Sequence, residues 1–481
     1  MKCQKFMRLF FSALLSSCLS LSPLTAQEAG DASPTARSMS FTVEQAVDYA
    51  LKNSRTLKSA DIDLEIKKRA ADNSWNVLLP TVQVSGTLSR QNNIDSAIDS
   101  ANASVEMANA IGQLMSAITK IPSSTTEKVK ATESMHWAAV GNLGISWNLS
   151  LAYIEQMKAA KADYESGLIS LQQSRRETET SVKKLFYGLL LQQENISLQK
   201  ATLENARRRS VQARTNYENG QIPELVYLQA NVAYENQKPE VQNAERLLKQ
   251  QLDTFAFLLG LPVGTNIELV GSIDLSFINV DADELLATYG GQNLAAQSLA
   301  SSLNLMQKNL NALNLSSFTP ALALNWGLQP MISDAFNKSW FERDNWSDQG
   351  SFSATLAWNI TNMLPFSANR QQAKDLEANM RKLQVSMETV QENQRMEVIK
   401  AVDTLNSARE QIAAMARNID LAQRSYNMTE RAYLAGATEL LELRDAETQL
   451  YQAQLGLANQ KFTYISALID LENTLNVTLS K

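Results

Sequence analysis

The sequence predicts a mainly α-helical chain with a small β part suited to a membrane, built from two copies of one unit. Two proline-free stretches are each long enough to form one continuous helix, and four short segments alternate apolar with polar residues. Matching motifs recur at fixed distances along the chain, which indicates a duplication within one fold.

The composition excludes several classes of protein before any motif is considered. The chain has 481 residues, of which 20% are charged and 44% are apolar, and this balance suits a folded protein. Its formal net charge is −6, so it lacks the basic excess of a nucleic-acid-binding protein. We therefore expect no nucleic acid among its partners.

The scarcity of histidine and cysteine argues against an enzyme. His136 is the only histidine, and the two cysteines, Cys3 and Cys18, lie near the start of the chain. Ser/His/Asp or Cys/His catalytic sets and Cys/His zinc sites need more of these residues than the chain has. A hydrolase based on carboxylates is an alternative, but the acidic series that stands out follows a helix rather than a cleft. We predict no catalytic residue, no cofactor and no metal site.

The start of the chain, 1–26, predicts an export signal. Lys2, Lys5 and Arg8 form a basic start, residues 9–24 are mostly apolar, and Ala26 offers a small residue for cleavage. The apolar stretch is too short and too rich in serine for a membrane anchor.

A second processing route stays open. The four residues Leu-Ser-Ser-Cys that end at Cys18 also fit a bacterial lipoprotein box, with lipid on this cysteine. We favour cleavage after Ala26, because the apolar run continues past Cys18. Residues 27–40 are then expected to form a flexible leader.

Two stretches predict very long helices. Residues 151–219 and 368–435 contain no proline, and a helix of this length would span roughly 100 Å. Each is followed by a glycine turn and a shorter return helix, at about 224–259 in the first copy and 438–475 in the second. The return helices alternate large and small residues at a period of seven, which predicts close side-by-side packing. An ordinary two-stranded coiled coil is the alternative.

The duplication is clearest around the two glycine turns. Tyr217 and Gly220 match Tyr433 and Gly436, and one constant offset relates both pairs. Each copy is expected to run helix, strand, strand, long helix, turn and return helix. The predicted organisation is a signal at 1–26, a leader at 27–40, a first repeat at 41–260, an irregular equatorial connector at 261–292, and a second repeat at 293–477.

Four segments with a period of two predict strands, at about 80–90, 136–150, 320–329 and 352–361. Each has one apolar face and one face of small, uncharged polar residues. Six of the seven tryptophans lie in or between these segments: Trp137, Trp147, Trp326, Trp340, Trp346 and Trp358. Aromatic residues around such strands are typical of a transmembrane barrel with lipid outside and water inside. A soluble antiparallel sheet packed on a core is the alternative.

Four strands are too few for a membrane pore, because known barrels need about eight or more. Open strand edges are not tolerated in lipid, so several chains would have to share one barrel. The stretch 91–134, between the first two strands, is rich in Ala, Ser and Met. We expect it to be a surface loop with a short helix around 101–118.

An acidic series follows the second glycine turn. Glu439, Glu442 and Asp445 are spaced by three, so they lie along one face of the return helix. From the residues alone, the simpler interpretation is a solvated acidic face that Arg444 or neighbouring helices neutralise.

These features together resemble the TolC-type outer membrane efflux family. The resemblance extends from Phe41 to about Val477, and it rests on the order and spacing of the motifs. The motifs are FTVEQAVDYALKN at 41–53, Leu-Leu-Pro at 78–80, Tyr-x-x-Gly-x-x-x-x-Leu at 217–225, and Tyr-x-x-Gly at 433–436 followed by LLELRDAETQL at 440–450.

The resemblance implies a homotrimer in the outer membrane of a bacterium. Each chain would lend four strands to a twelve-stranded barrel, and the long helices would form a tapering tunnel through the periplasm. The protein would be the exit duct of a tripartite efflux pump or of a type I secretion system. Its partners would be a periplasmic adaptor, an inner-membrane transporter and outer membrane lipid.

The resemblance also implies roles for residues at the second turn. Glu442 and Asp445 occupy the sixth and ninth positions after the turn glycine, where the family places the acidic rings of the tunnel entrance. Glu439 lies beside them, and the three residues are the candidate pore gate. Tyr433 would be the aromatic contact of the closed state.

The turns at Gly220 and Gly436 would dock the adaptor. Two positions depart from the family pattern near these turns. Thr438 stands where better-known members carry an arginine that latches the closed state, and Val226 replaces the aspartate that meets it.

An exported periplasmic coiled-coil protein, structural or adaptor-like and lipid-anchored at Cys18, is the alternative function. It would explain the long helices and the heptads. It would leave the four amphipathic strands and the cluster of tryptophans without a purpose.

Overall fold

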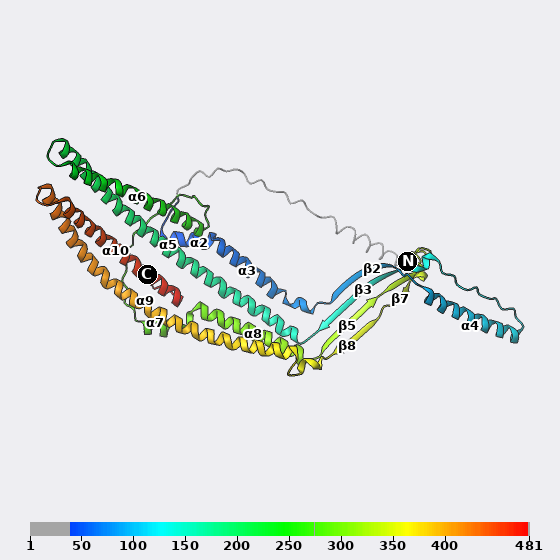
Figure 1. Cartoon of the computed structure of the whole chain (residues 1–481). Coiled ribbons are helices and arrows are strands. Elements are labelled where there is room, and N and C mark those ends of the chain that lie inside the picture. Colours follow the sequence, from blue (N-terminus) through cyan, green and yellow to red (C-terminus); the bar gives the residue numbers. More distant parts are fainter. Residues whose placement is uncertain (1–38, 274, 480–481) are drawn as a thin grey trace.

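The computed structural model describes residues 39–273 and 275–479. The molecule is elongated, with two helical hairpins pointing to one end and a small sheet beyond the other end of the long helices (Figure 1). Helix α4 projects past the sheet. The hairpin tips and the sheet are separated by helices of 67 residues, which span about 100 Å.

Each half runs helix, strand, strand, long helix and return helix. The first half contains β1 (Met39–Phe41), α2 (Val43–Asn53), α3 (Arg55–Asp72), β2 (Thr81–Arg90), α4 (Asp95–Thr119), β3 (Trp137–Leu149), α5 (Ala152–Glu218) and α6 (Glu224–Leu259). A connecting segment carries β4 (Ile267–Leu269) and α7 (Ala282–Tyr289). The second half contains α8 (Leu294–Phe318), β5 (Ala321–Leu328), β6 (Pro330–Ser333), β7 (Ser347–Asp348), β8 (Phe352–Ala357), α9 (Ala368–Leu434) and α10 (Leu440–Leu475).

The duplication is visible in the lengths of the helices. α5 and α9 each have 67 residues, and α6 and α10 each have 36. The starts of α5 and α9 are separated by the same number of residues as the starts of α6 and α10. The same separation relates Gly220 to Gly436. The predicted fold class, with long helices and a small antiparallel sheet, is therefore confirmed. No helix within the described ranges is long and apolar enough to cross a membrane.

Both hairpins turn in the same way. Gly220 and Gly436 have positive φ angles of 68° and 75°, a conformation that favours glycine. Each glycine N–H donates to the carbonyl oxygen of the tyrosine three residues earlier, at 2.9 Å for Tyr217 and 3.0 Å for Tyr433. The following N–H donates to the carbonyl oxygen five residues earlier, at 2.8 Å in both turns. These two bonds form a Schellman motif, which explains why both helices end at a Tyr-x-x-Gly sequence.

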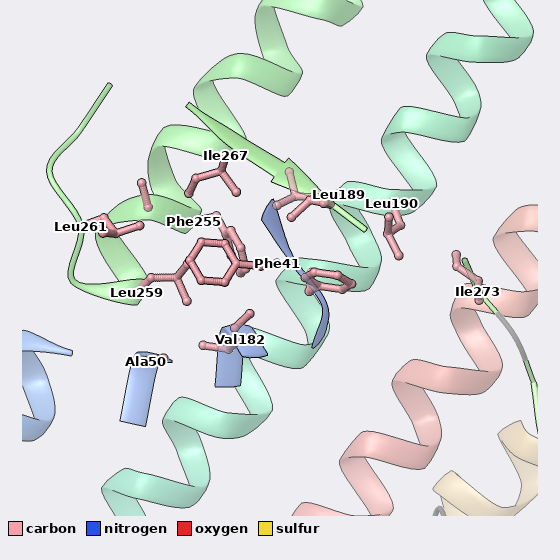
Figure 2. Close-up of a cluster of buried hydrophobic side chains, with 14 of the residues drawn as sticks. Phe41, Ala50, Val182, Leu189, Leu190, Phe255, Leu259, Leu261, Ile267 and Ile273 are labelled. Carbon is pink, nitrogen blue, oxygen red and sulfur yellow. The ribbon is translucent and has the colours of Figure 1, made fainter. Parts of the chain in front are cut away.

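A buried apolar cluster holds the first half together near the middle of the molecule. Strand β1 pairs in parallel with β4, and both cover side chains of α2, α5 and α6 (Figure 2). Phe41, Val182, Leu189, Phe255 and Leu259 are all buried there. The cluster stabilises the fold because each large side chain removed from water contributes about 1.5–3 kcal/mol.

The second half repeats this packing at equivalent positions. The offset that relates the glycine turns also relates Val182, Phe186, Leu189, Phe255 and Leu259 to five buried residues of α9 and α10, namely Val398, Val402, Leu405, Leu471 and Leu475. The same cluster contains Tyr464, whose hydroxyl accepts a hydrogen bond from the Ile278 N–H at 2.9 Å. The tyrosine thereby fixes the connecting segment against the helices.

The sheet contains four principal strands in the order β2-β3-β5-β8, all antiparallel. β6 pairs with the outer part of β3, and β7 pairs with β6. The register aligns one apolar row across the sheet: Val82, Ile145, Trp326 and Phe352. The adjacent row is polar: Thr81, Ser146, Asn325 and Ser353. The alternation seen within each strand is therefore continued across the whole sheet.

The segment between β2 and β3 differs from the predicted loop. We expected a loop over 91–134 with a short helix at 101–118, whereas α4 is a 25-residue helix, Asp95–Thr119. The amide side chains of Asn102 and Asn109 hydrogen-bond to the backbone of the returning chain and hold it along the helix. These bonds order a segment whose composition indicates a loop.

Smaller differences occur at the ends of other predicted segments. β8 ends at Ala357, and Ile360–Met363 forms a 3₁₀ turn where the chain bends towards α9. Of the expected leader, only Met39 and Ser40 are among the described residues, and both belong to β1. The predicted signal, with Cys18, lies outside the described residues.

Candidate functional site

The acidic residues predicted from the sequence lie at the tip of the second hairpin. Glu439 immediately precedes α10, and Glu442 and Asp445 lie on its first turns. All three residues are exposed, whereas the neighbouring Leu443 and Ala446 are buried. The carboxylates therefore lie on the face of α10 that points away from its own chain.

The charge of this acidic face is not neutralised by its own hairpin. Arg444 is exposed, and in the described part of the chain it forms no ion pair with Glu439, Glu442 or Asp445. Glu442 instead accepts a hydrogen bond from the Thr438 hydroxyl, Oγ1 to Oε2. A carboxylate face left open in this way attracts cations from solution.

Tyr433 packs inside its own hairpin. Its ring is half-buried against a small cluster formed by Tyr426, Leu443 and Leu450. This contact joins the end of α9 to the start of α10 and stabilises the tip. The role of Tyr433 in a closed state stays a prediction.

The two glycine turns lie at the tips of the hairpins, which point to the same end of the molecule (Figure 1). A side-chain carbon added at Gly220 or Gly436 would meet no atom within 4 Å. The tips are thus open surfaces, separate from the packed middle of the molecule. Docking of an adaptor there stays a prediction.

An ion pair that the sequence analysis missed joins the two hairpins beside the acidic tip. Arg209 Nη2 on α5 and Glu447 Oε2 on α10 lie 2.5 Å apart, and the two side chains are only 13% and 9% exposed. The Asn205 amide donates to the other carboxylate oxygen, Oε1, at 2.9 Å. The sequence holds one sign of this ion pair, because the acidic Glu447 lies beside the heptad positions Ala446 and Leu450, which are expected to be buried.

Tyr426 connects this ion pair to the apolar cluster. Burial, together with the nearby carboxylates of Glu430 and Glu447, raises the pKa of the Tyr426 phenol to about 12. The hydroxyl therefore stays protonated at neutral pH and donates to Glu430 Oε1 at 3.3 Å. Polar and apolar contacts at the second hairpin form one continuous patch.

Further polar contacts join α5 to α10 along their length. The Tyr451 hydroxyl donates to Asn195 Oδ1 at 2.7 Å. Nearer the middle of the molecule, the Thr180 hydroxyl donates to Asn473 Oδ1 at 3.1 Å. Side-chain hydrogen bonds and ion pairs therefore join the second hairpin to the first, beside the apolar contacts that Phe462 and Ile465 of α10 make with the buried cluster of the first half.

A known protein family matches both repeats of this architecture. The profile of the family described as outer membrane efflux protein matches residues 46–261 and 293–477, which is most of the chain. No curated protein sequence matches the chain.

Several solved structures share the fold. The CmeC outer membrane channel of Campylobacter jejuni is 16% identical with a TM-score of 0.71, and the match covers 91% of this chain and 87% of CmeC. The MtrE outer membrane channel of Neisseria gonorrhoeae, in its open state, is 16% identical with a TM-score of 0.67, covering 91% and 89%. CusC, solved in a study of folding and transmembrane channel formation, is 18% identical with a TM-score of 0.67, covering 90% and 91%.

The profile match, the duplicated hairpins and the shared fold confirm the resemblance drawn from the motifs. The alternatives of a carboxylate hydrolase and a periplasmic coiled coil do not account for a profile match over both repeats. The chain belongs to the outer membrane efflux protein family, and it is an outer membrane channel for efflux rather than an enzyme.

Proposed function

We propose that the chain assembles as a homotrimer and serves as the exit duct of a tripartite efflux pump or a type I secretion system. Three four-stranded sheets would join into one twelve-stranded barrel in the outer membrane. The helices of three chains would enclose a tunnel through the periplasm. Cargo would be selected by the inner-membrane transporter that feeds the duct, because the fold itself does not specify a substrate.

The free edges of the sheet are the observation that carries this proposal. Within the described chain, β2 pairs only with β3, and β8 pairs only with β5. All ten residues of β2 and all six of β8 are exposed. Unpaired backbone groups are not tolerated in lipid. Pairing β2 of one copy with β8 of the next would satisfy both edges and close the barrel.

The two faces of the sheet support a lipid-facing outside and a wet inside. Val82, Trp326 and Phe352 are large, apolar and exposed in the single chain. They share one face with the rest of their row, while the opposite face carries serine, threonine, asparagine and glycine. A barrel with lipid outside and water inside needs this separation.

The hairpin tips support the proposed partners. Gly220 and Gly436 lie at the end of the molecule opposite the sheet, so the tips would point away from the outer membrane (Figure 1). A periplasmic adaptor would dock at these turns and connect the duct to an inner-membrane transporter. The open space around both turns is consistent with such a contact.

The acidic tip supports a gate at the tunnel entrance. In a trimer, Glu442 and Asp445 of three copies would bring six carboxylates to one ring, with Glu439 beside them. A narrow carboxylate ring favours cations and binds multivalent ones most strongly. The proposed duct would therefore prefer cations and would be blocked by a trivalent cation.

Single-channel conductance in planar bilayers tests both parts of the proposal. The purified protein is expected to form stable channels that a trivalent cation blocks. Glu442→Ala combined with Asp445→Ala is expected to raise the half-blocking concentration at least about tenfold, which equals roughly 1.4 kcal/mol of lost attraction. The preference for cations, read from the reversal potential, should fall in the same variant.

A matched control removes the same charge elsewhere. Glu388 and Glu392 are exposed on α9, far from the turn, so Glu388→Ala with Glu392→Ala should leave the block unchanged. If both double variants block like the parent, the gate assignment is wrong while the duct stands. If the protein inserts into no bilayer and remains a soluble elongated particle, the duct itself is wrong.

A further inference from the structure

Helix α4 carries an apolar stripe that its own chain leaves uncovered. Met107, Ile111, Leu114 and Ile118 are 68%, 56%, 63% and 70% exposed. The helix lies beyond the sheet, at the end of the molecule opposite the hairpin tips (Figure 1). An exposed apolar stripe of this length marks an interaction surface.

The stripe has the spacing of a coiled-coil seam. The four residues follow one another at intervals of four, three and four, so Ile111 and Ile118 take heptad position a, and Met107 and Leu114 take position d. The same two positions continue towards β2 as three small residues: Ala97, Ser100 and Ser104. The seam is therefore strongly apolar only in the half of α4 that is farther from β2.

The opposite face of α4 is covered by the chain that returns from it. Asn102 pairs with the backbone of Val129, with Nδ2 to the carbonyl oxygen at 3.1 Å and the Val129 N–H to Oδ1 at 2.7 Å. Asn109 pairs in the same way with Thr126, at 2.8 Å in both directions. Both asparagines occupy heptad position f, directly opposite the seam.

Two other contacts fix this returning strap, residues 120–130. Glu106 forms an ion pair with Lys128. A side-chain carbon at Gly112 would lie 3.6 Å from Ser123, so the strap also packs closely near the far end of α4. The polar face of the helix is thus used within the chain, and the apolar face is left for another molecule.

We propose that α4 is an assembly helix: the seams of the α4 helices of three copies pack together outside the barrel end of the channel. The proposal rests on the proposed trimer, which brings three α4 helices to the same end. The link from β2 to α4 is short, residues 91–94, and β2 is the free edge that would meet β8 of the next copy. Each α4 therefore starts beside the proposed boundary between copies.

Other copies of α4 fit the stripe better than a membrane surface does. Helices that lie on anionic membranes carry Lys or Arg on their polar face. α4 contains the acidic residues Asp95, Asp99 and Glu106, and it contains no Lys or Arg. An apolar heptad without charges is complementary to itself. In isolated peptides, Ile at position a with Leu at position d favours a coiled coil of two helices. The proposed trimeric channel, and not the seam itself, would therefore set the number of packed helices at three.

Disulfide cross-linking in the full-length protein tests the seam. The two cysteines of the sequence, Cys3 and Cys18, lie in the predicted signal, and the described residues contain none, so in the processed protein a single Leu114→Cys adds the thiol that is tested. After mild oxidation of outer membranes, up to two of the three chains should run as a covalent dimer on a denaturing gel. Ile118→Cys should behave in the same way. Gln113→Cys is the matched control, because Gln113 is exposed on α4 but lies off the seam, and it should stay monomeric.

Light scattering of the detergent-purified protein separates the possible failures. A trimer in which Leu114→Cys and Ile118→Cys both remain monomeric on the gel overturns the assembly helix and leaves the channel intact. A monomer in light scattering overturns the proposed trimer and the assembly helix together. If Leu114→Cys stays uncross-linked and is protected from a water-soluble maleimide only in phosphatidylethanolamine/phosphatidylglycerol vesicles, the stripe binds lipid and the proposal is wrong.

Discussion

At the scale of single residues, the ion pair between Arg209 and Glu447 is mostly buried, so it should be sensitive to substitution. Glu447→Ala leaves the Arg209 guanidinium buried without its carboxylate, and we expect local stability to fall by about 3–5 kcal/mol. Arg209→Met with Glu447→Leu removes both charges and should recover most of that loss, because apolar residues of similar volume can replace a buried pair. Hydrogen exchange of nearby amides in α5 and α10 measures the free energy of local opening.

An exposed ion pair on the same hairpin provides the control. Arg424 and Asp420 on α9 lie 2.9 Å apart, but their side chains are 72% and 61% exposed. Asp420→Ala should therefore change the opening free energy by no more than about 0.5 kcal/mol. Equal losses for Asp420→Ala and Glu447→Ala would contradict the importance given to burial.

The residue scale also shows what spacing can and cannot predict. Three residues at intervals of three must share a helix face, so Glu439, Glu442 and Asp445 could be placed together from the sequence. Arg209 and Glu447 are 238 residues apart and lie on different hairpins. Their pairing depends on how α5 packs against α10, which no local pattern of the sequence specifies.

At the scale of the element, the glycines that follow the helices differ in how closely other atoms approach them. Gly436 has open space around it, whereas a side-chain carbon at Gly260 would lie 2.3 Å from the carbonyl oxygen of Asn53. Asn476 is the equivalent of Gly260 in the second repeat, and it holds a positive φ of 54° with a side chain present. Gly436→Asn should therefore cost less than about 1 kcal/mol, because Asn tolerates this conformation.

Gly260→Asn should cost about 3 kcal/mol or more, because the backbone at the α2–α3 junction has to move. The thermal midpoint of the detergent-purified protein, followed by circular dichroism, compares the two variants. A similar midpoint for both would mean that the conformation alone, and not the close approach of Asn53, requires glycine at position 260.

The elements differ in how well the sequence predicted them. The bounds of α5, α6 and α9 were predicted to within one residue, because glycine turns mark their ends and the two long helices are free of proline, although α6 continues through Pro239. α4 was underestimated for a physical reason. Its N-terminus has Ile94 in place of a capping side chain, and its polar face is satisfied by the distant strap rather than by a local signal.

At the scale of the whole molecule, the duplicated sequence gives two equivalent buried clusters and one shared sheet. The clusters use the same positions in both halves, such as Val182 and Val398, and Ile465 of α10 also packs into the first cluster, so the two hairpins are joined near the middle of the molecule. The sheet, in contrast, combines two principal strands from each half, and among the described residues the edges of β2 and β8 remain free. Both helical clusters therefore form within one chain, while the free edges of the sheet would be paired only in the proposed trimer.

The two faces of β2 give the sharpest test of this division. Val84 belongs to the apolar face and pairs with Leu143, whereas the next residue, Ser85, belongs to the polar face and pairs with Asn142. Val84→Lys would place a charge in lipid, at a cost of about 2–4 kcal/mol near the bilayer midplane. Ser85→Lys would place the same charge in the wet interior and should be tolerated. The fraction of protein recovered as heat-labile trimer from outer membranes should fall for Val84→Lys only. Full recovery of both variants would mean that neither face of β2 contacts lipid.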